Sequence, residues 1–121
     1  MCQSYLSAAT MFGFTLKYAC PDGYTPDPEQ VQRCGNSALA CATPEEAVAG
    51  ADLVVTDVWS SMGQEAEQAA RIKAFTGYQV NDGLMTKASK DALFMHCLPA
   101  HRGEEISEDM LDDPRAVVWD E

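Results

Sequence analysis

A thiol, two imidazoles and a guanidinium follow one apolar run near the end of the chain. The run Leu93–Met95 predicts a buried strand, which breaks into a Pro/Gly loop that holds His96, Cys97, His101 and Arg102. Open α/β sheets place their sites at such strand ends. A thiol in this setting can be an activated nucleophile, or a polar contact for a substrate amine with no covalent role. The alternative is an ordinary loop in which Cys97 is a small buried apolar residue.

A second loop whose side chains could take part in chemistry follows the apolar run Leu53–Thr56. It opens with Asp57, whose carboxylate can form a charge-assisted hydrogen bond with a substrate ammonium group. Ser61 can add a hydroxyl, and Met62 with Gly63 can form an apolar flap that excludes water when a ligand binds. The alternative for Asp57 is a helix cap or a surface acid. Because parallel strands end at one edge of a sheet, we expect the two loops to face the same crevice.

The elements that must position these loops alternate between strands and helices. This order predicts an α/β fold of three α/β/α layers around a parallel sheet of about four to five strands. Two helix starts are explicit: Asp27 precedes Pro28, and Thr43 forms a capping box with Glu46. The expected helices cover residues 1–13, 28–35, 44–50, 65–75 (with Ala69, Ile72 and Phe75 facing inward), 83–87 and a stretch capped by Ser107; the expected strands cover residues 14–20, 39–41, 53–56, 93–95 and 116–119.

Composition bounds the class of protein. The 121 residues fit one domain over 1–121, and a formal net charge of −11 argues against nucleic-acid binding. No apolar run approaches the roughly 18 residues of a membrane span, and no signal peptide opens the chain, so we expect a cytoplasmic protein without a membrane partner. The five cysteines are expected to be free thiols. We expect no cofactor and no metal, because Cys97, His96 and His101 lack the clustering of zinc ligands.

Three motifs, taken together, closely resemble ornithine carbamoyltransferase. They are Asp57-Val-Trp-Ser-Ser-Met-Gly-Gln-Glu65, Tyr78-Gln-Val-Asn81 and His96-Cys-Leu-Pro-Ala-His-Arg-Gly-Glu-Glu105. The resemblance spans nearly the whole chain, in order. The His-Cys-Leu-Pro motif is shared with other carbamoyltransferases, whereas the Ser-Met-Gly loop resembles the ornithine-specific version. The chain therefore resembles the second, ornithine-binding domain of this family, which is Rossmann-like.

The resemblance implies a homotrimeric enzyme of arginine metabolism that converts L-ornithine and carbamoyl phosphate into L-citrulline and phosphate. By matching position, Asp57, Ser61 and Met62 hold the α-amino and carboxylate end of ornithine. Cys97 and Leu98 lie at the reacting δ-nitrogen and the carbamoyl group. Cys97 and Asp57 are then the catalytic residues, acting as substrate positioners. Four further residues are expected to support the site: His96, Pro99, Arg102 and Gln79.

The sequence also departs from the family's pattern. The 121 residues hold no Ser-x-Arg-Thr loop, which in the family grips carbamoyl phosphate, and both ends resemble truncations. The segment 33–43 is shorter than the family's usual helix and strand. We therefore expect this chain to be inactive alone. Two alternatives stay open: a carbamoyltransferase for a related amine (putrescine or acetylated ornithine), and a stand-alone amino-acid-binding or assembly domain without catalysis.

Overall fold

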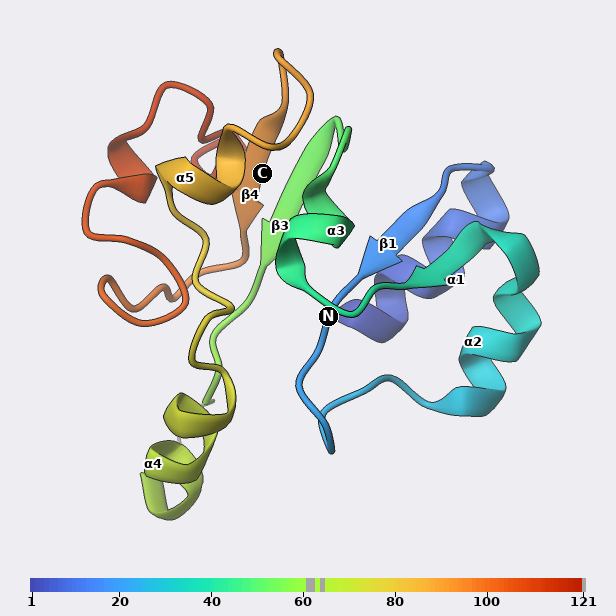
Figure 1. Cartoon of the computed structure of the whole chain (residues 1–121), viewed down its shortest axis with the longest axis horizontal. Helices are drawn as coiled ribbons and strands as arrows, with labels where there is room; N and C mark the ends of the chain where they lie inside the picture. Colours follow the sequence, from blue (N-terminus) through green and yellow to red (C-terminus); the bar gives the residue numbers. More distant parts are fainter. Residues whose placement is uncertain (61–62, 64, 121) are drawn as a thin grey trace. The chain divides into compact units, whose positions relative to one another are not determined.

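The computed structural model describes residues 1–60, 63 and 65–120, which form two compact units. Unit 1 covers Met1–Ala47 and unit 2 covers Val48–Glu121. Each unit contains one pair of parallel strands with helices beside it (Figure 1). The candidate site lies within unit 2.

Unit 1 is built from three helices and two short strands. Its pair β1–β2 is parallel and in register from Leu16↔Ala38 to Tyr18↔Ala40. Its core contains Leu6, Cys34 and Ala38. The elements are α1 (Cys2–Phe12), β1 (Leu16–Tyr18), α2 (Pro28–Cys34), the 3₁₀ turn η1 (Gly35–Ser37), β2 (Ala38–Ala40) and α3 (Pro44–Val48), the last of which continues into unit 2.

Both explicit helix starts of unit 1 are confirmed. Asp27 Oδ1 accepts a hydrogen bond of 2.9 Å from the backbone N–H of Glu29, with Pro28 in the first turn of α2. At α3, Thr43 Oγ1 accepts from the N–H of Glu46 at 3.2 Å. The Glu46 carboxylate reaches back to the N–H of Ala42, one residue beyond the usual capping-box partner.

Unit 2 carries the strands whose ends hold the candidate site. Its pair β3–β4 is parallel, with Leu53 opposite Leu93 and Thr56 opposite His96. The core gathers around Phe94 of β4, which is fully buried. The elements are β3 (Leu53–Thr56), α4 (Glu65–Ala74), α5 (Asp82–Met85), β4 (Leu93–His96) and the 3₁₀ turn η2 (Met110–Asp112); the core comprises Val48, Val54, Val80, Leu84, Met85, Ala92, Phe94, Ile106, Met110, Leu111 and Val118.

The sheet differs from the expected single one of four to five strands. Over the described residues it consists of two separate pairs, β1–β2 and β3–β4. The strand expected at 116–119 is wrong: Ala116 makes one parallel bridge to Phe94, and the chain turns over 117–120, where the N–H of Asp120 donates to the carbonyl of Val117. Because the chain turns directly after Ala116, this segment does not continue along β4 as a strand. The α/β class and the parallel pairing are confirmed.

Two helix predictions in unit 2 also need correction. The helix expected after Ser107 shortens to the single 3₁₀ turn η2. On α4, Ala69 and Ile72 are exposed instead of facing inward, and Phe75 is half-buried. Just beyond the C-terminal end of this helix, the Phe75 ring stacks on Trp59 with centroids 5.6 Å apart. Among the described residues, no helix combines the length and apolar character that crossing a bilayer requires.

Arg115 fastens the segment after β4 to α5. Its guanidinium donates to both carboxylate oxygens of Asp113, at 2.8 and 2.6 Å, and to Asp82 Oδ1 at 2.6 Å. Its backbone carbonyl accepts from the N–H of Phe94 at 2.9 Å. The hydrogen bond from Arg115 holds the pKa of Asp113 below its usual value, against the opposing effect of burial.

We predict that Arg115→Gln lowers the free energy of unfolding at pH 7 by about 1–2 kcal/mol, because it breaks a bidentate, charge-assisted pair. The folded-state pKa of Asp113 is depressed, so this stabilisation is complete above the ordinary value of 3.8 and is lost as the pH falls through the folded-state pKa. Urea unfolding at pH 7 and at a series of pH values falling from 3.8 measures both effects. Arg33→Gln is the control, because its ion pair with Glu29 is largely exposed. The prediction is contradicted if Arg115→Gln lowers the free energy of unfolding by the same amount at low pH as at pH 7.

Candidate functional site

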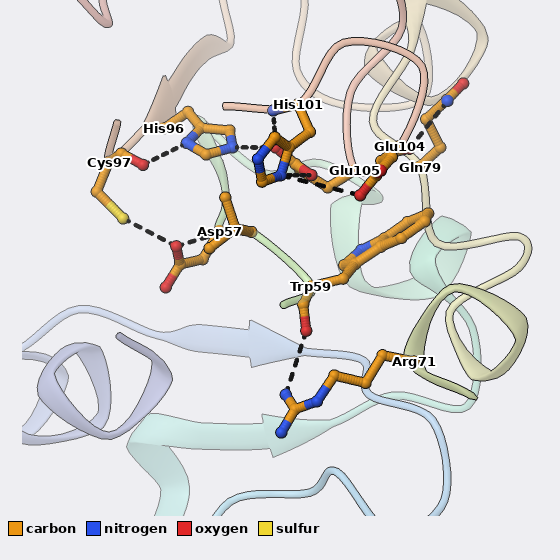
Figure 2. A network of polar contacts seen from close by, with 10 residues as sticks. Asp57, Trp59, Arg71, Gln79, His96, Cys97, His101, Glu104 and Glu105 are labelled. Atoms are coloured by element: carbon orange, nitrogen blue, oxygen red, sulfur yellow. Dashed lines mark hydrogen bonds and ion pairs between the residues drawn. The ribbon is translucent and has the colours of Figure 1, made fainter. Parts of the chain in front are cut away.

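The C-terminal ends of β3 and β4 bring a carboxylate and a thiol together. Thr56 and His96 are paired across the two strands, so Asp57 and Cys97 each stand one residue beyond the last pair. The Cys97 thiol donates a hydrogen bond of 3.1 Å to Asp57 Oδ1 (Figure 2). The expectation that the two loops meet at one edge is confirmed for these two residues.

Asp57 is held by its own loop as well as by the thiol. The backbone N–H of Val58 donates to Asp57 Oδ1 at 2.8 Å, and the residue is half-buried. Both of these donors use Oδ1, which leaves Oδ2 outside both bonds. The loop is tied down further along, where Arg71 Nη1 donates to the carbonyl oxygen of Trp59 at 3.1 Å. This carboxylate is therefore not a helix cap, but a fixed acceptor beside a thiol.

His96 points away from the neighbouring sulfur and into the unit. Its Nδ1 lies 2.6 Å from the Cys97 carbonyl oxygen, and its Nε2 lies 2.9 Å from Glu105 Oε1 (Figure 2). A carbonyl and a carboxylate both accept hydrogen bonds, so the two ring nitrogens are satisfied together when both carry protons. Burial alone lowers the pKa of His96. The hydrogen bonds to Glu105 and to the Cys97 carbonyl, with the charges of Glu105 and Asp57, outweigh it and raise the pKa above its ordinary value.

This arrangement separates the two chemical roles that the sequence left open for Cys97. A thiol nucleophile of the Cys–His type needs the imidazole to take the proton from sulfur. Here the thiol proton is directed at Asp57, and both His96 nitrogens face oxygen atoms. His96 is therefore not placed to take a proton from the Cys97 sulfur.

Residue-by-residue reasoning assigned no role to Glu105, which the structure places against His96. Its side chain is fully buried. Its Oε1 accepts from His96 Nε2 and, at 2.6 Å, from the backbone N–H of His101. The only sequence signal was its place at the end of the third motif, immediately before the apolar Ile106.

The other predicted site residues support the loop after β4 in different ways. Gln79 Nε2 donates to the carbonyl of Glu104 at 3.0 Å. Arg102 binds away from Cys97, to the carbonyl of Glu108 and, at 3.0 Å, to Asp112. Leu98 is half-exposed, and its peptide bond to Pro99 is cis. The roles expected for Ser61 and Met62 lie outside the described residues.

A shallow hollow of about 410 Å³ opens beside the site residues of this loop. It is lined by Trp59, Ile72, Gln79 and Glu104, among others, and not by Asp57 or Cys97. The hollow therefore adjoins the supporting residues and not the thiol–carboxylate pair.

Comparison with known proteins gives consistent matches over the whole chain. The family described as "Aspartate/ornithine carbamoyltransferase, Asp/Orn binding domain" matches residues 1–121. The chain is 60% identical to the anabolic ornithine carbamoyltransferase of Pseudomonas aeruginosa and 58% identical to the ornithine carbamoyltransferase of Nitrosococcus oceani, in each case over all of this chain and 40% of the relative. The solved structure of the ornithine carbamoyltransferase from Pyrococcus furiosus matches with a TM-score of 0.87 and 45% identity, over 98% of this chain and 40% of that one. The chain thus spans about two fifths of the length of these relatives.

We predict that Asp57→Asn speeds alkylation of Cys97 by iodoacetamide. The thiolate is the reacting species, and a carboxylate in contact with the sulfur opposes its formation. Two unit charges at about 4 Å repel by about 1 kcal/mol even in water, so the rate should rise at least about fivefold at neutral pH. Mass spectrometry of the Cys97 peptide over time measures this rate.

The matched control for that experiment is Asp52→Asn, which removes an exposed acid at the opposite end of β3. The other four cysteines serve as internal standards and should react at unchanged rates in both variants. Equal Cys97 rates in Asp57→Asn and in the unaltered chain would show that the thiol–carboxylate contact does not control reactivity.

Proposed function

The chain belongs to the aspartate/ornithine carbamoyltransferase family, and from this membership and the site geometry we propose that it supplies the ornithine-binding part of an ornithine carbamoyltransferase. The reaction is transfer of a carbamoyl group from carbamoyl phosphate to the δ-amine of L-ornithine, giving L-citrulline and phosphate. The observation that carries the proposal is the 3.1 Å contact between Cys97 and Asp57 at the adjoining ends of β3 and β4.

Each residue's proposed role follows from what its atoms offer. Asp57 Oδ2 lies outside the bonds from Val58 and Cys97, so it is the oxygen proposed for a substrate ammonium group. Cys97 and Leu98 are proposed to line the δ-amine, which must lose its proton before it can attack the carbamoyl carbon. Ser61 and Met62 are proposed for the α-amino and carboxylate end of ornithine, on the strength of the Ser-Met-Gly motif.

His96, Glu105 and Gln79 are proposed as positioning residues. His96 and Glu105 form a buried pair that fixes the direction of the Cys97 carbonyl, and Gln79 holds the backbone at Glu104. Arg102 and Pro99 belong to the same loop, and their part in the proposed site is to shape it. None of these five side chains needs to touch the substrate for this role.

We also propose that residues 1–121 act as one ornithine-binding domain, within a cytoplasmic homotrimer of arginine metabolism that binds neither nucleic acid nor membranes. The resemblance of the three motifs to the family supports the trimer and the pathway, and the net charge of −11 supports the lack of a nucleic-acid partner. We expect the 121-residue chain to form no citrulline alone, because it holds no Ser-x-Arg-Thr loop to stabilise the leaving phosphate.

The proposal predicts that L-ornithine shifts the backbone amide NMR signals of Asp57, Gly63, Cys97 and Leu98 in the purified chain. Asp57→Asn should weaken this binding at least about tenfold, since a hydrogen bond to a charged group contributes roughly 1.5–3 kcal/mol. Asp52→Asn is the matched control and should bind as the unaltered chain does.

Putrescine separates this proposal from its main alternative. It has the two amines of ornithine but no carboxylate, so it should produce weaker shifts at these positions. Equal shifts with putrescine would favour a carbamoyltransferase for a related amine. Absence of shifts with L-ornithine on a well-folded spectrum would overturn the assignment of a binding site to this chain, and citrulline formation by the chain alone would overturn the expected inactivity.

A further inference from the structure

Three side chains of the loop after β4 converge on one point. They belong to His101, Glu104 and Glu105 (Figure 2). One ring nitrogen and one oxygen from each carboxylate lie within 4.8 Å of one another. His101 Nδ1 is 3.8 Å from Glu104 Oε2 and 3.8 Å from Glu105 Oε2.

The two carboxylate oxygens in this cluster are buried and have no hydrogen-bond donor among the residues that the structure describes. The Glu105 side chain is fully enclosed, and its Oε1 is occupied by His96 and the His101 N–H, whereas Oε2 accepts no hydrogen bond. Glu104 Oε2 is likewise buried without a donor. A separation of 3.8 Å from the His101 nitrogen is too long for a hydrogen bond. Two such oxygens side by side carry an unfavourable desolvation free energy unless a positive group lies between them.

We propose that His101, Glu104 and Glu105 bind a divalent transition-metal ion of the Zn²⁺ type. A point equidistant from the three atoms lies roughly 2.1–2.5 Å from each, close to the 2.0–2.2 Å of zinc–nitrogen and zinc–oxygen bonds. An imidazole ligand disfavours Mg²⁺ and Ca²⁺, and the absence of sulfur from this set disfavours Cu(I). The His101 side chain is 45% exposed, so water can complete the coordination.

The surroundings fit a bound cation. Glu105 Oε1 is held by His96, an outer partner that orients a ligating carboxylate and leaves its Oε2 turned toward the cluster. Glu104 also lines the hollow beside Trp59 and Gln79, so one residue of the cluster borders an open part of the surface. The cluster differs from the set of His96, Cys97 and His101 that the sequence led us to reject as ligands. It shares Glu105 with the proposed ornithine site, but binding of an ion to it does not require ornithine to bind.

Titration of the 121-residue chain with Zn²⁺ under reducing conditions tests this proposal. One equivalent of Zn²⁺ should shift the His101 ring nitrogen signals in a long-range ¹⁵N–¹H NMR spectrum. Zn²⁺ held by cysteines would leave the His101 ring unshifted, so this signal isolates the site. Glu104→Gln should weaken the response at least tenfold, and His101→Asn should remove one bound equivalent in equilibrium dialysis.

Glu108→Gln is the matched control, because Glu108 is an exposed acid of the same loop outside the cluster. It should bind Zn²⁺ as the unaltered chain does. The chosen variants avoid Glu105, whose removal would leave His96 without its buried partner. The proposal is overturned if His101 stays unshifted in a tenfold excess of Zn²⁺, or if Glu104→Gln binds as tightly as Glu108→Gln.

Discussion

The register of β3 against β4 is the constraint on which the rest of unit 2 depends. Thr56 pairs with His96, and this pairing alone sets Asp57 beside Cys97. A slip of one residue would turn the fully buried Phe94 toward solvent, because side chains alternate across a strand. The apolar core therefore specifies the position of the thiol, and the same free energy that packs Phe94 also holds the thiol–carboxylate contact in place.

A buried charge makes the loop after β4 depend on the strand before it. Glu105 is fully enclosed, and an isolated carboxylate there would be strongly unfavourable. Its donors come from His96 at the end of β4 and from the His101 backbone, so the loop folds back over the strand to supply them. This requirement also explains why His96 does not serve the neighbouring sulfur: its ring is committed to Glu105 and to the Cys97 carbonyl.

The features of the fold and of the candidate site that could be predicted from the sequence are those that depend on neighbouring residues. Asp27 and Pro28 mark a helix start through their own short-range chemistry, and Leu53–Thr56 is apolar enough to predict a buried strand. The meeting of Asp57 and Cys97 followed from the rule that parallel strands end at one edge. The burial of Glu105 could not be predicted, because it depends on donors whose position only the folded loop determines. The missing strand at 116–119 has the same origin, since a turn after Ala116 overrides a local apolar pattern.

The protein's own contacts hold Asp57 and Cys97 in place, and this bears on what the pair can contribute to a reaction. Asp57 already holds two donors on one oxygen, and Cys97 is fixed by the strand end behind it. Such a pair can orient an amine at little further entropic cost, which is the contribution expected of a positioning site. Two cationic groups of the loop after β4 are already engaged within the described residues, His96 with Glu105 and Arg102 with Asp112. Under the proposed function, the contribution of the Asp57–Cys97 pair is therefore to position the amine.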